Sequence, residues 1–137
     1  KGIRAIAMNG KTLYAAGYFS GDIHVAKGDV FDVQRKLGNN MLASAEGRGN
    51  MYFHDATLGF QGWQSCASCH PNDARADGLN WDLLNDGLGN PKNTKSLLLS
   101  HQTPPCMVTG IRANAEIAVR SGIKYILFAL MQTIVFP

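Results

Sequence analysis

Two thiols and an imidazole stand close together in the run Cys-Ala-Ser-Cys-His at positions 66–70. The spacing Cys-x-x-Cys-His is the attachment signature of haem c. Each thiol adds to one of two neighbouring vinyl groups on the porphyrin edge, and one helical turn gives the sulfurs the separation that this requires. The histidine that follows directly then ligates the iron from the proximal side. We therefore predict one covalent haem c, bound through Cys66 and Cys69, with His70 as an iron ligand.

Three other interpretations of the same residues have to be weighed. A Cys₃His zinc site could combine the two cysteines with Cys106 and a histidine, but the nearby His101 gives an imperfect second ligand pair. A thioredoxin-like redox pair would need a strand before the motif and a long helix after it, whereas Pro71 and a loop rich in Gly and Asn follow here. A chance occurrence is the third. The specificity of the motif favours haem over all of them.

The sixth iron ligand is predicted to be Met107, which also makes it a metal ligand. Two prolines precede it in the run Gln-Thr-Pro-Pro-Cys-Met at positions 102–107, and each restricts its own φ to about −65°, which stiffens the loop. A stiff loop can hold a weak thioether ligand at a small entropic cost. Alternatives are Met131, a histidine such as His101, or an open position, and a methionine among helical core residues such as Met131 is usually packing.

Two further residues are predicted to bind the cofactor. Arg112 flanks the expected ligand loop, and a guanidinium suits a haem propionate, although a solvated surface charge is an equally good explanation. Trp81 is expected in the wall of the haem pocket, where its indole N–H could reach a propionate. Trp63 and Phe60 could be pocket walls or ordinary core.

The elements that must position these residues differ along the chain. Two apolar runs, 3–8 and 12–16, flank the strong hairpin pair Asn9-Gly10, and a third short strand is expected around 23–25. Residues 28–39 turn polar and predict a linker, with room for one short element around Val33. A helix is expected over about 43–54, leading into the Cys-x-x-Cys-His run.

The second half of the chain is predicted to hold a long irregular stretch followed by a helix. Residues 71–106 are rich in Asn, Asp, Gly and Pro, and so long an irregular stretch is unusual unless it surrounds something such as a haem. A final helix is expected to begin at an Asn114 N-cap, with Glu116 in its first turn. Apolar residues then recur at three- and four-residue steps from Val119 to Ile134. A break at Ser121-Gly122 is possible on sequence grounds.

The composition sets broad limits. The chain has 137 residues and a formal net charge of +3, and its 13 basic residues form no long run, so nothing points to nucleic acid. The longest apolar stretch near the end is too short for a bilayer, which takes about 20 residues. No signal peptide is visible before Lys1, so we expect either that one was removed or that this is a piece of a longer chain. The domains are predicted as a β segment 1–27, a linker 28–39 and a cytochrome c-like haem domain 40–137, a mainly α fold.

A family resemblance rests on several blocks that occur in order between Glu46 and Leu127. They are Gly-Arg-Gly-Asn-Met-Tyr-Phe at 47–53, Cys-Ala-Ser-Cys-His-Pro at 66–71, Asp-Gly-Leu-Asn-Trp-Asp-Leu at 77–83, Asn-Pro-Lys-Asn-Thr-Lys-Ser-Leu at 90–97, Thr-Pro-Pro at 103–105, Met107, Gly-Ile-Arg at 110–112 and Ala-Val-Arg at 118–120. This stretch resembles the cytochrome c domain fused to β-propellers in bacterial proteins related to the dihaem cytochrome c peroxidases. Residues 10–21 look like the last blade of such a propeller.

The resemblance implies a periplasmic or extracellular c-type cytochrome in which His70 is the proximal ligand. It also implies electron transfer or peroxide reduction. The dihaem peroxidases need two haems, whereas this chain has a single Cys-x-x-Cys-His, so the complete peroxidase reaction cannot occur within it.

The predicted function is therefore electron transfer by one haem c that cycles between Fe(III) and Fe(II). The expected partner is a redox protein or other haem subunits, in a larger assembly. Two alternatives remain: a component of a haem peroxidase with an open sixth iron position, and a structural haem subunit of an electron-transfer assembly.

Overall fold

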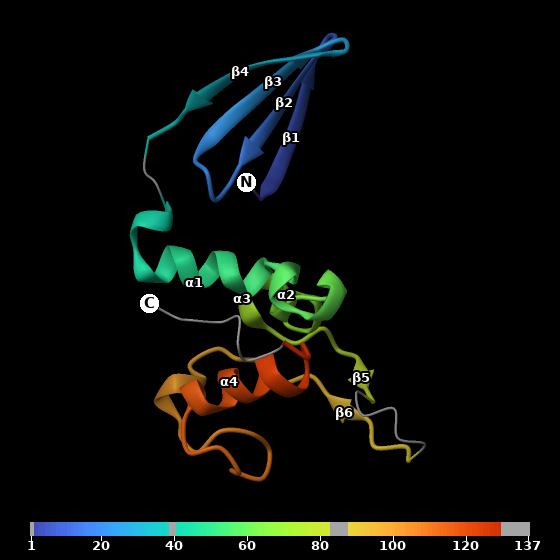
Figure 1. Ribbon diagram of the computed structural model, residues 1–137, viewed down its shortest axis with the longest axis vertical. Helices are drawn as coiled ribbons and strands as arrows, with labels where there is room; N and C mark the ends of the chain where they lie inside the picture. Colours follow the sequence, from blue (N-terminus) through green and yellow to red (C-terminus); the bar gives the residue numbers. More distant parts are fainter. Residues whose placement is uncertain (1, 39–40, 83–87, 130–137) are drawn as a thin grey trace. The chain divides into compact units, whose positions relative to one another are not determined.

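The computed structural model describes residues 2–38, 41–82 and 88–129, apart from the side chains of residues 31–34 (Figure 1). Chain contacts divide the protein into two compact units, Lys1–Tyr52 and Phe53–Pro137. We call them the first and the second unit and describe each by itself.

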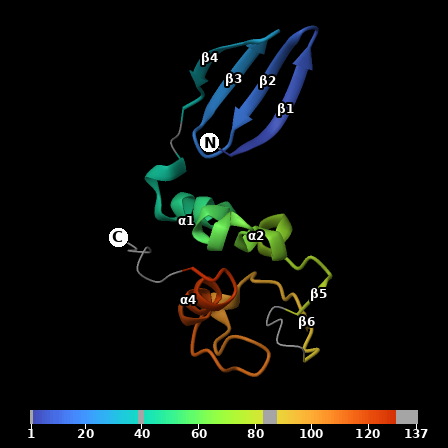
Figure 2. The ribbon, with the colours of Figure 1, turned by 45° about the vertical axis from the view of Figure 1, so that its right-hand side comes forward.

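The first unit contains a four-stranded antiparallel sheet in which neighbours in sequence are neighbours in space. Its strands are β1 (Ile3–Asn9), β2 (Thr12–Gly17), β3 (Asp22–Lys27) and β4 (Val30–Lys36), in the order β1-β2-β3-β4 (Figures 1 and 2). The first turn pairs Asn9 with Thr12, and Gly10 has a φ of +60°, as a tight hairpin requires. Gly21 and Gly28 supply positive φ in the next two turns. The expected hairpin and third strand are thus confirmed.

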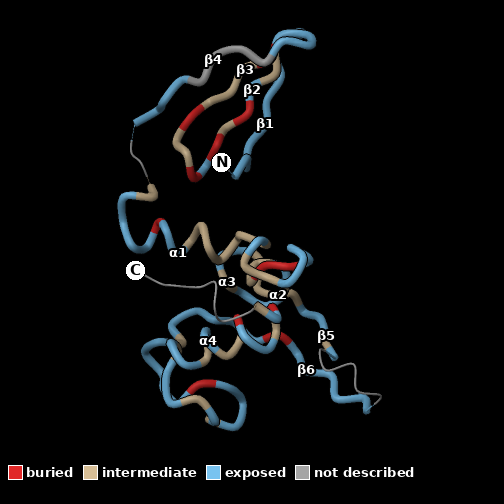
Figure 3. Tube along the Cα trace, in the orientation of Figure 1, coloured by how far each residue is buried: buried red, intermediate tan, exposed pale blue. Residues whose placement is uncertain are grey.

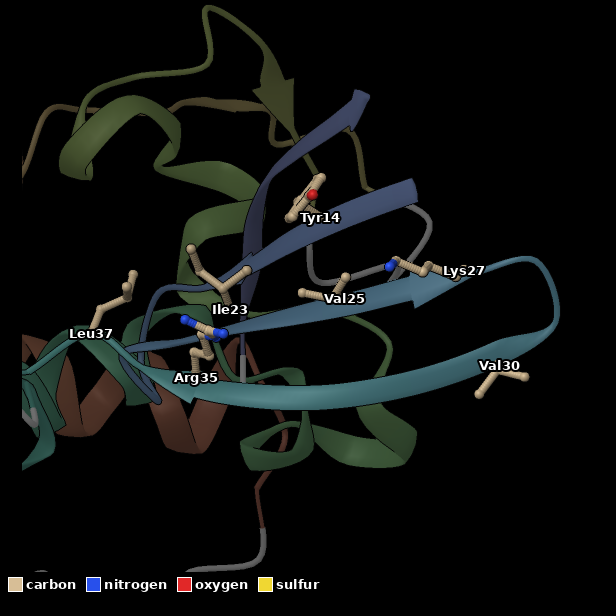
Figure 4. A pocket seen from close by; sticks show the side chains of 7 residues that line it. All are labelled: Tyr14, Ile23, Val25, Lys27, Val30, Arg35 and Leu37. Carbon is tan, nitrogen blue, oxygen red and sulfur yellow. The ribbon is translucent and has the colours of Figure 1, made fainter. Parts of the chain in front are cut away.

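Both faces of this sheet carry apolar side chains. Ala15 and Ala26, which lie on one face, are buried, as the tube in Figure 3 shows for parts of β2 and β3. The opposite face is hollowed, and this hollow is seen from close by in Figure 4. It is lined by Tyr14, Ile23, Val25, Lys27, Val30, Arg35 and Leu37. No thiol or imidazole is among these residues, so the hollow has no part in the haem chemistry predicted from the sequence.

The expectation of a mainly α fold with a short β segment is wrong. Among the described residues, a four-stranded antiparallel sheet stands beside the helices, so the fold is not mainly α. The fourth strand, β4, falls within residues 28–39, where the sequence turns polar. A strand is recognised in sequence by alternating apolar residues, and this alternation is missing here because Asp32, Gln34 and Arg35 are polar.

A short 3₁₀ turn, η1 (Met41–Ala43), precedes helix α1 (Ala45–His54), which confirms the helix expected at 43–54. The backbone N–H of Gly47 donates to the Ser44 hydroxyl at 2.9 Å. Gly47 is buried, and a Cβ there would overlap the carbonyl oxygen of Met41. The lack of a side chain at Gly47 is what lets η1 fold back onto the start of α1.

The second unit is built from short elements joined by irregular chain. They are η2 (Ala56–Leu58), η3 (Phe60–Gly62), α2 (Cys66–Cys69), α3 (Pro71–Ala74), β5 (Asn80–Trp81), β6 (Lys92–Asn93), η4 (Ser100–Gln102) and α4 (Ala115–Tyr125). Only α4 exceeds a single turn within the described part of this unit. The long irregular stretch expected from Pro71 onward is present and is pinned by the small β5–β6 ladder.

Helix α4 begins where the sequence predicts. The Asn114 side chain accepts a hydrogen bond from the Ile117 N–H at 2.9 Å, which caps the helix. The helix runs through Ser121 and Gly122 without a break and ends at Tyr125, whereas the apolar residues expected after Ala129 lie outside the described residues. None of the described helices has both the length and the apolar character that crossing a bilayer demands.

Candidate haem-attachment site

The two cysteines lie on a single helical turn. Ser65 is the N-cap of α2, and Ser65 and Ser68 form a reciprocal capping box in which the Ser65 N–H donates to the Ser68 hydroxyl at 3.0 Å. The turn closes where the His70 N–H donates to the Cys66 carbonyl, also at 3.0 Å. The local sequence therefore makes the compact turn that presents two thiols and then an imidazole.

Both thiols are half-buried and are held in the neutral form. Burial raises the pKa of Cys66 above its usual value. Burial also raises the pKa of Cys69, and the negative charge of Asp77 and the neighbouring Cys66 add to this effect. A disulfide oxidoreductase needs the opposite shift, toward the thiolate. The site therefore does not favour the thioredoxin-like interpretation.

His70 supplies an imidazole that the rest of the described chain leaves unused. Its Nδ1 atom is buried and has no hydrogen-bond partner among the described residues. A buried polar atom without a partner is costly, and a bound water, ion or ligand is one way in which proteins satisfy it. The imidazole of His70 could ligate the iron of a haem, so the observation fits a haem at this site.

The chain leaves the motif through an unusual left-handed turn. Pro71 starts α3, and the next three residues, Asn72, Asp73 and Ala74, have φ values of 51°, 61° and 66°. Asn and Asp tolerate this region, whereas an alanine there is disfavoured. Two backbone hydrogen bonds hold this turn. The Arg75 N–H donates to the Pro71 carbonyl at 2.9 Å, and the Leu97 N–H donates to the Ala74 carbonyl at 2.8 Å.

Asp77 organises the loop that follows the motif. Its carboxylate accepts hydrogen bonds from the Leu79 N–H at 2.9 Å, from the Trp81 indole N–H at 2.7 Å and from the Thr94 side chain. Partial burial alone would raise the pKa of Asp77, but these hydrogen bonds outweigh it and lower the pKa. The indole N–H of Trp81, which we expected to reach a propionate, is thus already bonded to Asp77. Sequence analysis missed Asp77, since its donors come from positions up to 17 residues away.

Met107 and Arg112 lie in a loop whose two ends pair. The Cys106 N–H donates to the Arg112 carbonyl at 2.7 Å, and the return bond measures 3.3 Å. Met107 is 62% exposed, with a φ of 73°. Arg112 is half-buried, and its guanidinium makes no hydrogen bond or ion pair with the described residues, so it remains available to an anion.

Met107 and His70 belong to different segments of the second unit, the loop closed by Cys106 and Arg112 and the end of α2. In the views of Figures 1 and 2 the loop after Cys106 lies below α4, whereas α2 lies above it. Met131, the alternative methionine ligand, lies outside the described residues.

The zinc interpretation finds no support in the arrangement of side chains. Across residues 2–38, 41–82 and 88–129, no three His, Cys, Asp or Glu side chains gather as metal ligands would. Cys106 is buried, and its thiol lies 3.6 Å from the Ser100 carbonyl. It thus behaves as a small packing residue.

Large apolar side chains of the second unit stay on its surface. Among its described residues, the buried apolar ones are limited to Cys106, Ile123 and Leu127. Exposed ones include Phe60, Trp63, Leu79, Leu97, Leu98, Leu99, Met107, Val108 and Ile111. Soluble monomers rarely leave so much apolar surface uncovered. A porphyrin ring is a large apolar body, so these side chains also fit a haem.

Comparisons with known proteins show a similarity to hydrazine synthase. The chain is 44% identical over 68 residues to hydrazine synthase subunit gamma of Kuenenia stuttgartiensis, which is 50% of this chain and 19% of that protein. A solved structure of hydrazine synthase from the same organism, pressurised with xenon, matches 63% of this chain and 31% of its own chain, with 30% identity and a TM-score of 0.51. The chain therefore spans about a fifth of the length of the curated relative.

These comparisons correct the family resemblance suggested by the sequence. No protein-family model matches the chain. The similarity found is to hydrazine synthase subunit gamma, and not to the propeller-fused cytochromes related to the dihaem cytochrome c peroxidases. The physical reason is that Cys-x-x-Cys-His reports how a haem is attached, which says little about the fold around it. Half of the chain is thus similar in sequence to a part of hydrazine synthase subunit gamma.

Proposed function

We propose that this chain binds one haem c covalently through Cys66 and Cys69, with His70 on the iron, and that it transfers single electrons. The observation that carries the proposal is the turn 66–70. It presents two neutral thiols and then an imidazole whose buried Nδ1 has no partner among the described residues. The haem, when bound, supplies an Fe(III)/Fe(II) couple; the chain attaches it, covers it and sets its surroundings.

The similarity to hydrazine synthase subunit gamma supports a role within a larger redox assembly. We propose that the partners are other haem subunits or a redox protein of that assembly, and that the chain acts in the periplasm or outside the cell. The free guanidinium of Arg112 is proposed to pair with a propionate. Domain limits at about 27 and 40 remain our proposal for where the haem domain begins.

Intact-mass measurement tests the attachment. The chain should be produced in a host that attaches haem c, and its mass should exceed that of the polypeptide by one haem that acid-acetone does not extract. Replacing both Cys66 and Cys69 by alanine should remove the covalent haem, whereas Cys106→Ala should keep it. A colourless wild-type protein, or one that carries zinc, would refute the proposal.

A peroxidase component with an open sixth iron position is the second candidate. The exposure of Met107, at 62%, favours it, because a methionine that binds iron would be expected to lie against the haem. A high-spin oxidised spectrum that changes when peroxide is added would select this candidate over electron transfer.

A further inference from the structure

The helical turn that carries the two thiols is too short to be stable through its own backbone. Helix α2 has four residues, Cys66–Cys69, and the His70 N–H closes it on the Cys66 carbonyl at 3.0 Å. Isolated helices shorter than about 12 residues are marginal in water, because the first turn fixes several dihedral angles for a single hydrogen bond. Groups outside the regular helical pattern must therefore stabilise this turn.

Ser65 and Ser68 supply these groups. The Ser65 N–H donates to the Ser68 hydroxyl at 3.0 Å, and the Ser68 N–H donates to the Ser65 carbonyl at 3.1 Å. The Ser65 hydroxyl completes the reciprocal capping box. Ser65 is buried, so water is a poor substitute for the Ser68 hydroxyl as a partner of its N–H. All of these bonds join groups of this chain, so the chain itself can hold the turn.

The distance between the two thiols depends on whether this turn is formed. Cβ atoms three residues apart are separated by about 5 to 6 Å on a helix, whereas three residues of extended chain span about 10 Å. The vinyl groups that receive Cys66 and Cys69 are neighbours on one edge of the porphyrin. Once the first thioether has formed, the second addition is intramolecular, and its rate depends on how well the remaining thiol is placed. The helical turn places that thiol within reach of its vinyl group.

We infer that Ser68, together with Ser65, is a positioning residue that holds this turn ready for the second thioether bond. The inference rests on the proposed haem function. In each addition the thiol sulfur bonds to the vinyl carbon next to the ring, the thiol hydrogen moves to the terminal vinyl carbon, and the π bond between these carbons breaks. No oxidant or reductant is consumed. One of the two variable positions of Cys-x-x-Cys-His thus has a function in this chain.

The test counts thioether bonds in the full chain produced in a host that attaches haem c. The absorption of the haem in alkaline pyridine shifts with each vinyl group that is lost, so it separates haem held by two thioethers from haem held by one. Ser68→Ala removes the acceptor of the Ser65 N–H, whereas Ser68→Thr and Ser68→Gln each keep one. The matched control is Asn114→Ala, which removes the cap of α4, a 2.9 Å bond of the same kind elsewhere in the second unit.

We expect Ser68→Ala to lower the ratio of doubly to singly bonded haem by about fivefold, the usual effect of one lost helix cap on a helix equilibrium. Ser68→Thr or Ser68→Gln should restore the ratio, and Asn114→Ala should change it less than twofold. An unchanged ratio in Ser68→Ala, an equal fall in Asn114→Ala, or no restoration by either replacement would overturn the inference. If Ser68→Ala yielded no protein, Ser68 would be a folding residue, which also overturns it. A wild-type chain without covalent haem would instead refute the proposed function.

Discussion

The side-chain amide of Gln64 donates a 3.0 Å hydrogen bond to the carbonyl of Ile126, one residue beyond the end of α4. Gln64 is 5% exposed, and the nearby Phe60 N–H bonds the Leu127 carbonyl at 2.8 Å. The residue directly before the cap of α2 is thus fastened to the end of the longest helix of the second unit. This contact fixes the haem motif to the small core around Leu127.

Replacing Gln64 by alanine should destabilise the second unit. The change leaves the Ile126 carbonyl without its donor inside the protein, at a cost of about 1 to 3 kcal/mol. Urea unfolding of the haem-loaded protein, followed by haem absorbance, measures it. Gln61→Ala is the control, because Gln61 is exposed and should change the midpoint little. Equal effects of both changes would show that the Ile126 contact contributes no stability.

The sixth ligand can be tested at Met107. If its thioether binds iron, the oxidised protein shows a weak far-red charge-transfer band, and Met107→Ala abolishes it and lowers the reduction potential. Met51→Ala, a change in α1, should keep the band. If the wild-type protein lacks the band, the sixth ligand is a histidine or the sixth position is open.

Two glycines of α1 should respond in opposite ways to the same substitution. Gly47→Ala places a Cβ onto the Met41 carbonyl and should cost about 1 to 3 kcal/mol through overpacking. Gly49→Ala meets nothing within 4 Å and should stabilise the helix by up to about 1 kcal/mol. Thermal unfolding followed by circular dichroism compares them. If the two variants had the same melting temperature, the close packing of η1 against α1 at Gly47 would be contradicted.

The first unit should lose stability in acid through Asp22. The Ser20 hydroxyl, which donates to its carboxylate, is the main cause that lowers the pKa of Asp22, with the neighbouring His24 adding to it against partial burial. A carboxyl whose pKa is lower in the folded than in the unfolded state stabilises the fold above about pH 4, its unfolded value. That contribution is lost as the pH falls through the folded pKa.

Asp22→Asn should therefore be less stable than the wild type at pH 7, and the difference should shrink at pH 3. Urea titrations at both pH values give the two differences. Asp29→Asn, in an exposed turn, serves as the control. A difference that stayed the same at both pH values would mean that the charge of Asp22 does not contribute.

Local signals in the sequence located several elements correctly. Asn9-Gly10 predicted the first hairpin, and Asn114 predicted the start of α4, because turn and cap chemistry acts within three or four residues. The turn that carries Cys66 and His70 follows from the motif for the same reason. These features need no knowledge of the rest of the fold.

Features that depend on distant partners could not be predicted in this way. Strand β4 owes its place to pairing with β3, and its polar residues give no apolar alternation. Asp77 accepts a hydrogen bond from the side chain of Thr94, which is 17 residues further along the chain, so no local pattern marks it. The family resemblance failed for a related reason, since short blocks of sequence report local features and not the protein that surrounds them.

The scarcity of buried apolar side chains in the second unit has a consequence for how the protein matures. With little interior of its own among the described residues, this unit would draw much of its folding free energy from the haem that we propose it binds, as other ligand-dependent domains do. In chains that have not yet received a haem, the second unit would then unfold readily and be cleaved by proteases. The rate of haem supply, and not the rate of synthesis, would set how much protein accumulates.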